Sequence, residues 1–398
     1  MNVPSSKPFN LFISVGEESA DLHASRVCEE LKSQRPDMNL FGFGGSEMEK
    51  AGVKILYPLP ELALIGFVEV VKHLPQVRKI EQSALKIWEE QKPDAVVFVD
   101  FPGLHLRLAR SAHERGIPVI YYIAPQVWAW REKRVERMRK TIDRLLVIFP
   151  FEEPFFEARG LSAKYVGHPL AERIPQVDTN PTPTDPPSEE DLASPLIGLL
   201  PGSRKNELRH TLPCMIRAAH GLRQQLPSAR FLLPLASSLS ITTLQRFSVP
   251  PWIEVCRDPD YQRRREITFA WTCSGTATVE NALLGVPMAV VFRTGPINMF
   301  LGRRLVRVPY IGMVNLIARK GICPEFIQEQ FQPETLTRYT MELLSNPARY
   351  REMKEDLKKV REQIGDHPAA KETAEEILNF LTHRLEGDLG RREKDYLG

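Results

Sequence analysis

The stretch Thr272–Arg293 reads TCSGTATVENALLGVPMAVVFR and indicates the local fold more clearly than any other part of the chain. It follows an apolar run, and it begins with a small-residue turn at Ser274–Thr276 and an amphipathic segment. A second turn, Gly285–Pro287, then leads into the apolar run Met288–Phe292. This order predicts strand, tight turn, helix, turn and strand, which is the βαβ unit of a parallel sheet.

The turn at Ser274–Thr276 has the features of an anion-binding site. A glycine turn that opens a helix brings backbone N–H groups and the positive end of the helix dipole close to an anion. Glu280 comes one helical turn after Thr276, within reach of a second part of the same ligand. Phosphate at the turn and hydroxyl groups at the carboxylate would describe a nucleotide. The same spacing also fits an ordinary βαβ unit with a surface glutamate.

Length and composition limit the possible classes of protein. At 398 residues the chain is long enough for two α/β domains of similar size. A hydrophobic content of 42% with 26% charged residues excludes a wholly disordered chain. The 53 basic and 50 acidic residues leave a net charge of +3, which argues against a dedicated nucleic-acid-binding protein.

The cysteines and the N-terminus bear on the compartment. The 5 cysteines are scattered without CxxC spacing, so neither a disulfide framework nor a zinc site is indicated, and a reducing cytoplasm is expected. The N-terminus, MNVPSSKPFNLFISVGEE, lacks the basic-then-apolar pattern of a signal peptide. No window reaches about eighteen uninterrupted apolar residues, so no membrane-spanning helix is predicted, and association with a membrane surface stays open.

Short apolar runs alternate with helical patterns in both halves of the chain, which predicts parallel sheets covered on both faces. We expect an α/β protein with two Rossmann-like, doubly wound domains that face a cleft at the carboxyl ends of their strands. The apolar runs are Phe9–Val15, Leu40–Phe43, Ala95–Val99, Val119–Ile123, Arg144–Phe149, Leu196–Leu200, Arg230–Leu235, Ile253–Cys256, Ile267–Cys273 and Met288–Phe292. The predicted parts are a first domain (1–175), a Pro-rich linker (176–194), a second domain (195–365) and a C-terminal helix that frays after about residue 385 (366–398).

Two further strand ends carry candidate chemistry. Ser203 and Arg204 follow the run Leu196–Leu200 and open a helix, and a guanidinium there suits a diphosphate leaving group, although Arg204 also fits a plain surface residue. Asp100 ends the buried run Ala95–Val99, where a carboxylate could act as a general base or simply cap the next turn. Ser19, in the early turn before a helix, could cap that helix and also faces the predicted cleft.

The segment 59–77 carries a wide apolar face at helical spacing, including Leu64, Phe67, Val68, Val70, Val71 and Leu74. Such a face is usually core. The alternative is a surface that holds acyl chains or enters a bilayer, and basic clusters near residues 131–140 and 302–307 favour that alternative. Trp128 and Trp130 fit either sugar stacking or core packing.

Several ordered motifs together resemble the lipid A disaccharide synthases, glycosyltransferases of the B-type fold, over nearly the whole chain. The matching stretches are Gly16–Asp21 (GEESAD), Asp100–Pro102 (DFP), Val127–Arg131 (VWAWR), Val166–Leu170 (VGHPL), Leu200–Arg204 (LPGSR), Ser274–Glu280 (SGTATVE) and Asn315–Ala318 (NLIA). The resemblance implies an inverting transfer from UDP-2,3-diacylglucosamine to the 6-hydroxyl of 2,3-diacylglucosamine 1-phosphate (lipid X). The products are a β-1,6 disaccharide and UDP.

The resemblance also implies roles for single residues. Asp100 would be the catalytic base, and Arg204 would stabilise the departing UDP. Gly275 and Thr276 would hold its phosphates and Glu280 its ribose, with no metal and no cofactor. The remaining implied contacts with substrate or UDP are made by Ser19, Ser203 and Asn315.

Partners follow from the same resemblance. Both substrates carry acyl chains, so the apolar face at 62–77 becomes a landing surface on the inner membrane of a Gram-negative-type bacterium, with the enzyme cytoplasmic and peripheral. The C-terminal helix has two expected places, on the first domain or on a partner in a homodimer. The alternatives are another UDP-sugar enzyme of this fold, either a soluble-acceptor transferase or an epimerase, and a non-catalytic nucleotide- and lipid-binding protein.

Overall fold

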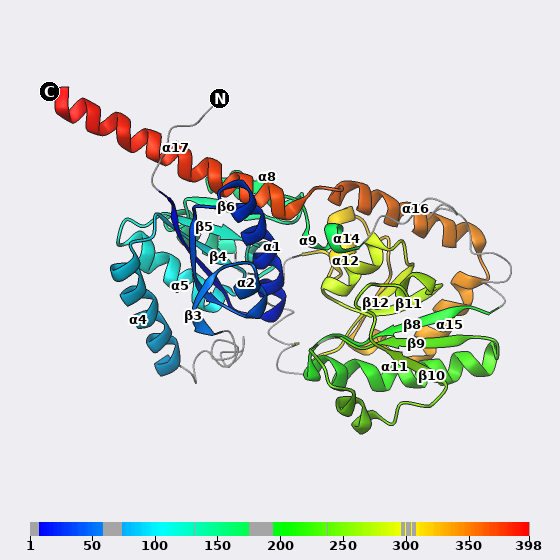
Figure 1. Ribbon diagram of the computed structural model, residues 1–398. Coiled ribbons are helices and arrows are strands. Elements are labelled where there is room, and N and C mark those ends of the chain that lie inside the picture. The colour runs from blue at the N-terminus through cyan, green and yellow to red at the C-terminus, as the bar shows by residue number, and fades with distance from the viewer. Residues whose placement is uncertain are drawn as a thin grey trace. The chain divides into compact units, whose positions relative to one another are not determined.

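The computed structural model describes residues 8–58, 74–130, 132–174, 194–236, 238–295, 299, 304 and 308–397. The chain forms two compact units, which Figure 1 shows. The first unit combines Met1–Pro169 with His367–Gly398, and the second is Leu170–Asp366. The predicted apolar face lies outside the described residues, except that Leu74 is the first helical residue after the gap.

Among the described residues of the first unit, seven strands form one sheet in the order β3-β2-β1-β4-β5-β6-β7, and every pairing is parallel. The central strand β4 reads AVVFV and is buried throughout, as expected for a strand covered on both faces. The strands are β1 (Asn10–Val15), β2 (Asn39–Gly44), β3 (Lys54–Pro58), β4 (Ala95–Val99), β5 (Val119–Tyr122), β6 (Arg144–Val147) and β7 (Ala163–Tyr165).

Helices connect these strands. They are α1 (Glu18–Gln34), α2 (Ser46–Lys50), α4 (Leu74–Gln91), α5 (Pro102–His113), α6 (Val127–Trp130), α7 (Val135–Arg139) and α8 (Glu152–Glu157), with a 3-10 turn at Glu132–Arg134. The C-terminal α17 (Ala369–Leu397) also belongs to this unit, whereas α9 (Pro169–Arg173) begins at Pro169 and continues in the second unit. Helix α4 packs on α5, and α1 packs on α2 and α17.

The C-terminal helix belongs to the first unit. It packs on α1 (Figure 1), and its residues Ala374, Ile377 and Leu381 are buried in the core of this unit. An ion pair of 2.7 Å between Arg144 and Glu376 fixes the contact. The helix continues to Leu397, so the frayed end predicted after residue 385 is wrong.

The described part of the second unit holds a six-stranded sheet in the order β10-β9-β8-β11-β12-β13, again parallel throughout. The strands are β8 (Leu196–Leu200), β9 (Arg230–Pro234), β10 (Ile253–Cys256), β11 (Phe269–Cys273), β12 (Met288–Phe292) and β13 (Glu325–Ile327). The helices are α11 (Lys205–Gln225), α12 (Thr276–Leu283), α14 (Met313–Ala318), α15 (Pro333–Leu344) and α16 (Pro347–Ile364), and 3-10 turns lie at Ile241–Phe247, Arg264–Glu266 and Gln328–Gln330.

Local sequence explains several helix starts. Proline occupies the first turn of α5, α15 and α16, where its missing N–H costs nothing. Asn346 caps α16 by accepting the Arg349 N–H at 3.1 Å. None of the described helices is long and apolar enough to cross a membrane.

Candidate active site

The strand order reverses between β1 and β4 in the first sheet, and in parallel α/β sheets ligands bind at such a reversal. Val15 and Val99 are paired in register at the carboxyl ends of these strands. The residues that follow them, Gly16 and Asp100, therefore start neighbouring turns at this edge. The structure brings the predicted base and the GEESAD motif together.

Asp100 has an unusual backbone conformation. Its φ is 51° and that of Phe101 is 52°, so two successive non-glycine residues are left-handed. The Phe101 ring covers Gly16: a Cβ on Gly16 would lie 2.1 Å from Cγ of that ring. Glycine at position 16 is thus required by the close approach of Phe101.

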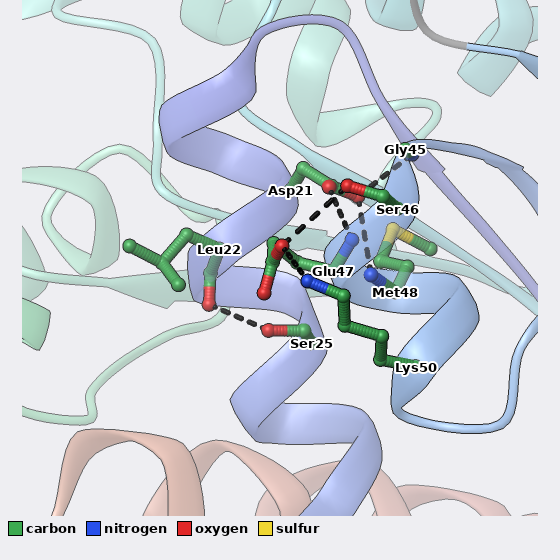
Figure 2. Close-up of polar contacts among 8 residues, drawn as sticks. All are labelled: Asp21, Leu22, Ser25, Gly45, Ser46, Glu47, Met48 and Lys50. Carbon is green, nitrogen blue, oxygen red and sulfur yellow. Dashed lines mark hydrogen bonds and ion pairs between the residues drawn. The ribbon is translucent and has the colours of Figure 1, made fainter. Parts of the chain in front are cut away.

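The carboxylate of Asp21, on α1, binds the turn that follows β2 and begins α2, as Figure 2 shows. Its buried carboxylate accepts the backbone N–H groups of Gly45 (2.7 Å), Glu47 (3.0 Å) and Met48 (3.4 Å), which lie at the start of α2. Asp21 therefore caps α2 rather than its own helix, whose N-cap residue Glu17 makes no side-chain cap hydrogen bond. Ser19, two residues before Asp21, is exposed on the surface of α1.

The tryptophan motif is anchored by a carboxyl group that sequence reasoning missed. Trp128 of α6 donates its indole N–H to Oε1 of Glu152 at 2.9 Å, and the backbone N–H of Phe149 donates to Oε2 at 3.1 Å. The Trp128 ring lies edge-on to Phe151, with centroids 5.1 Å apart. Burial raises the pKa of Glu152 to about 7, although these hydrogen bonds act in the opposite direction.

Glu152→Gln is expected to change how stability depends on pH. Between about pH 4.5 and pH 7 the folded protein keeps a proton on Glu152 that the unfolded chain has released. The reason is that folding raises the pKa of Glu152 from 4.5 to about 7. The retained proton contributes about 3 kcal/mol to the free energy of unfolding. This contribution is full below pH 4.5 and is lost as the pH rises through 7. Urea unfolding of both proteins at pH 5 and pH 8 should show the variant gaining stability relative to wild type at pH 8. Equal changes in the two proteins would contradict the expectation.

In the second sheet the order reverses between β8 and β11, where Leu200 and Thr272 are paired. The turn after β8 contains Gly202 with φ 107°, and Glu207 accepts the backbone N–H groups of Ser203 (2.9 Å) and Arg204 (3.2 Å). The side chains of Ser203 and Arg204 are exposed, and that of Arg204 is 71% accessible. This guanidinium lies 3.7 Å from the Glu207 carboxylate and is otherwise open to a ligand.

The neighbouring turn after β11 is open to a ligand. Gly275 is the N-cap of α12 with φ 136°, and no atom lies within 4 Å of the place where a Cβ would be. Two hydrogen bonds hold Ser274. Its N–H donates to the Val291 carbonyl at 3.0 Å, and its hydroxyl donates to the Ile311 carbonyl at 2.6 Å. Thr276 is exposed on the first turn of α12. Backbone donors and a helix N-terminus thus lie beside the Arg204 turn.

Glu280 is held by two residues that sequence reasoning missed. Tyr261 donates its hydroxyl to Oε1 at 2.9 Å, and Arg264 donates to Oε2 at 2.5 Å. Asp258 fixes this loop by accepting the backbone N–H groups of Arg263 (3.0 Å) and Arg264 (2.9 Å). The signal in the sequence is the basic run at 263–265 in the loop after β10.

Asn315 lies behind the Ser274 turn. Its buried amide donates to the Cys323 carbonyl and to Glu325 Oε1, both at 2.8 Å, and accepts the Cys323 N–H at 2.9 Å. Glu325 in turn accepts the N–H groups of Ile311 (2.9 Å) and Gly312 (2.9 Å). Asn315 is therefore connected to the turn through Glu325 and the segment that accepts the Ser274 hydroxyl.

The family of the chain follows from a comparison with protein families. Residues 11–379 match the family model described as Lipid-A-disaccharide synthetase. The chain belongs to the lipid-A-disaccharide synthase family. The lipid-A-disaccharide synthase of Syntrophotalea carbinolica is 36% identical over 384 residues, covering 96% of this chain and 97% of that protein. The lipid-A-disaccharide synthase of Trichlorobacter lovleyi is 34% identical over 382 residues, covering 94% of this chain and 98% of that protein.

Solved structures agree at the level of the fold. The UDP-GlcNAc 2-epimerase from Neisseria meningitidis bound to UDP-GlcNAc has a TM-score of 0.61 at 14% identity and covers 94% of this chain and 100% of that one. The glycotransferase of kitacinnamycin has a TM-score of 0.63 at 16% identity and covers 94% of this chain and 99% of that one. These likenesses confirm the predicted B-type glycosyltransferase fold. The lipid-A-disaccharide synthase family makes the chain a glycosyltransferase of lipid A biosynthesis, as predicted, and does not favour the epimerase or soluble-acceptor alternatives.

Proposed function

We propose that the chain transfers 2,3-diacylglucosamine from its UDP derivative to the 6-hydroxyl of 2,3-diacylglucosamine 1-phosphate, with inversion. The family supports the reaction. The observation that supports the assignment to residues is that Asp100 in one sheet, and Arg204 and Gly275 in the other, follow the strands between which the order reverses. The proposal therefore assigns the base to the first sheet and the diphosphate contacts to the second.

In this mechanism the Asp100 carboxylate takes the proton of the acceptor hydroxyl as its oxygen attacks the anomeric carbon. The bond from that carbon to the UDP oxygen breaks as the new bond forms. Arg204 and the N–H groups after Gly275 stabilise the negative charge that grows on the diphosphate. The Glu280 carboxylate accepts hydrogen bonds from the ribose hydroxyl groups. Thr276, Ser203 and Ser19 complete the proposed direct contacts, and the buried Asn315 is proposed to support the nucleotide site through Glu325.

The reaction is tested by incubating the purified chain with both acylated substrates in detergent and measuring UDP and disaccharide. Product should form with the diacylated acceptor and not with glucosamine 1-phosphate. A folded protein that binds UDP but forms no disaccharide would refute the proposal. Equal rates with the acceptor that lacks acyl chains would instead support a soluble-acceptor transferase.

Arg264→Met is expected to weaken UDP binding about tenfold, because Glu280 loses the charged partner that orients it towards a ribose. Arg263→Met is the matched control, since Arg263 pairs with Glu254 (2.6 Å) and Glu266 instead. Titration calorimetry with UDP measures both. Equal affinities of the two variants would show that orientation of Glu280 does not matter.

We further propose that the enzyme works on the cytoplasmic side of the inner membrane, with the face at Leu64, Phe67, Val68, Val70, Val71 and Leu74 as its apolar contact. Exposed cations at Lys133, Arg137, Arg139 and Lys140 in the first unit support attraction to anionic lipid. Co-sedimentation with vesicles of anionic phospholipid tests this, and no binding at low salt would refute it. A homodimer is also proposed, and light scattering that gives the monomer mass would refute that.

A further inference from the structure

The backbone of Asp100 is bonded at every polar atom. Its N–H donates to the Tyr122 carbonyl at 2.9 Å. Its carbonyl oxygen accepts two hydrogen bonds of 2.7 Å, one from the Tyr121 hydroxyl and one from Nδ1 of His105. A carbonyl oxygen has two lone pairs, so both are used.

The proton positions around His105 follow from these bonds. A carbonyl can only accept, so Nδ1 carries the proton, and burial keeps the imidazole neutral by lowering its pKa to about 4. The other nitrogen, Nε2, is then an acceptor for the Ser14 hydroxyl at 2.9 Å. Ser14 therefore donates to His105, and His105 donates to the carbonyl of Asp100.

Aromatic packing fixes the orientation of the imidazole. The ring stacks on Phe98 with centroids 5.1 Å apart and lies edge-on to Phe101 at 5.7 Å and Tyr121 at 6.4 Å. Ser14, His105 and Tyr121 are fully buried. These side chains do not face the surface on which a substrate would bind, so they act on the reaction through Asp100.

Because the backbone of Asp100 is left-handed, the hydrogen bonds to its carbonyl affect the direction of its side chain. Left-handed φ and ψ are unfavourable for a residue with a Cβ, and they set the direction in which the carboxylate leaves the backbone. Two hydrogen bonds to the carbonyl hold the peptide plane that follows Asp100. Loss of either bond removes part of the restraint on this strained peptide and so on the direction of the carboxylate.

We propose that Tyr121, His105 and Ser14 are positioning residues that hold the general base of the reaction in its working direction by clamping its backbone carbonyl. The proposal rests on the proposed function, in which Asp100 takes the proton of the acceptor. It assigns to the clamp an effect on turnover and none on UDP or acceptor binding.

Tyr121→Phe tests the clamp by removing one hydroxyl. It should lower kcat about tenfold while KM for both substrates and Kd for UDP stay within about twofold. His105→Leu should lower kcat further, and His105→Asn, whose amide can donate near the position of Nδ1, should restore part of the loss. The matched control is Tyr350→Phe in the second unit, which removes another buried 2.7 Å bond from a tyrosine hydroxyl to a carbonyl, that of Thr268. It should leave kcat unchanged.

The same substitutions in an Asp100→Ala background separate this proposal from the proposed function. If the clamp acts through the carboxylate, Tyr121→Phe has no further effect there. Full activity of Asp100→Ala would refute Asp100 as the base. Loss of activity in Asp100→Ala with a wild-type kcat for both Tyr121→Phe and His105→Leu would overturn the clamp alone, as would additive losses. Should Tyr121→Phe fail to fold, the comparison of His105→Asn with His105→Leu still decides.

Discussion

Asp100→Asn is expected to lower kcat by about 10² to 10⁴-fold, the range that a general base contributes. The amide has the size of the carboxylate but cannot take the proton of the acceptor hydroxyl. UDP affinity should stay nearly unchanged, because the proposed nucleotide contacts come from the other sheet, at Arg204, Gly275 and Glu280. The measurements are the rate of UDP release under saturating substrates and the UDP Kd from calorimetry.

Asp94→Asn is the matched control for this loss. Asp94 precedes β4 at its amino end and accepts the Asn10 N–H at 2.7 Å, a bond that an amide oxygen can also accept. Its replacement should leave kcat unchanged. A full rate in Asp100→Asn would mean that another group takes the proton. A parallel loss of UDP binding would mean that Asp100 supports the site rather than the chemistry.

The sequence predicted the inner strands and the edge strand β10, and it missed the other three edge strands. Runs such as Ala95–Val99 and Met288–Phe292 appear in the structure with the predicted bounds, because a parallel strand buried on both faces is continuously apolar. The missed strands are β3, β7 and β13, each the last strand of its sheet. These three strands are less buried and carry polar residues such as Lys54 and Glu325, so their short apolar runs do not stand out in the sequence.

The candidate site was predictable where a motif follows a strand, and only there. Asp100, Arg204 and Gly275 come 1, 4 and 2 residues after buried strands, so each parallel sheet places them near its carboxyl edge. Tyr261 and Arg264 reach Glu280 from 19 and 16 residues away, through a loop with no apolar periodicity. The hydrogen bonds of Asn315 likewise depend on the position of β13, which the sequence did not reveal.

Gly16→Ala is expected to lower the free energy of unfolding by about 3 kcal/mol and kcat by about 10²-fold. The new methyl group would lie 2.1 Å from Cγ of Phe101 and 2.3 Å from Cδ1, so the ring has to move. Phe101 follows Asp100 in the chain and shares its left-handed conformation, so movement of its backbone turns the base. Urea unfolding and the rate of UDP release measure the two effects.

The cause of this loss can be separated from a general intolerance of alanine. Gly295→Ala is the control, since no atom lies within 4 Å of its added Cβ and it should cost little. Combining Gly16→Ala with Phe101→Ala removes the ring that the methyl group meets. The double variant should then be destabilised by less than the sum of the single variants. Additive losses would show that the Phe101 ring is not what requires glycine at position 16, and the link from the GEESAD motif to the direction of Asp100 would fail with it.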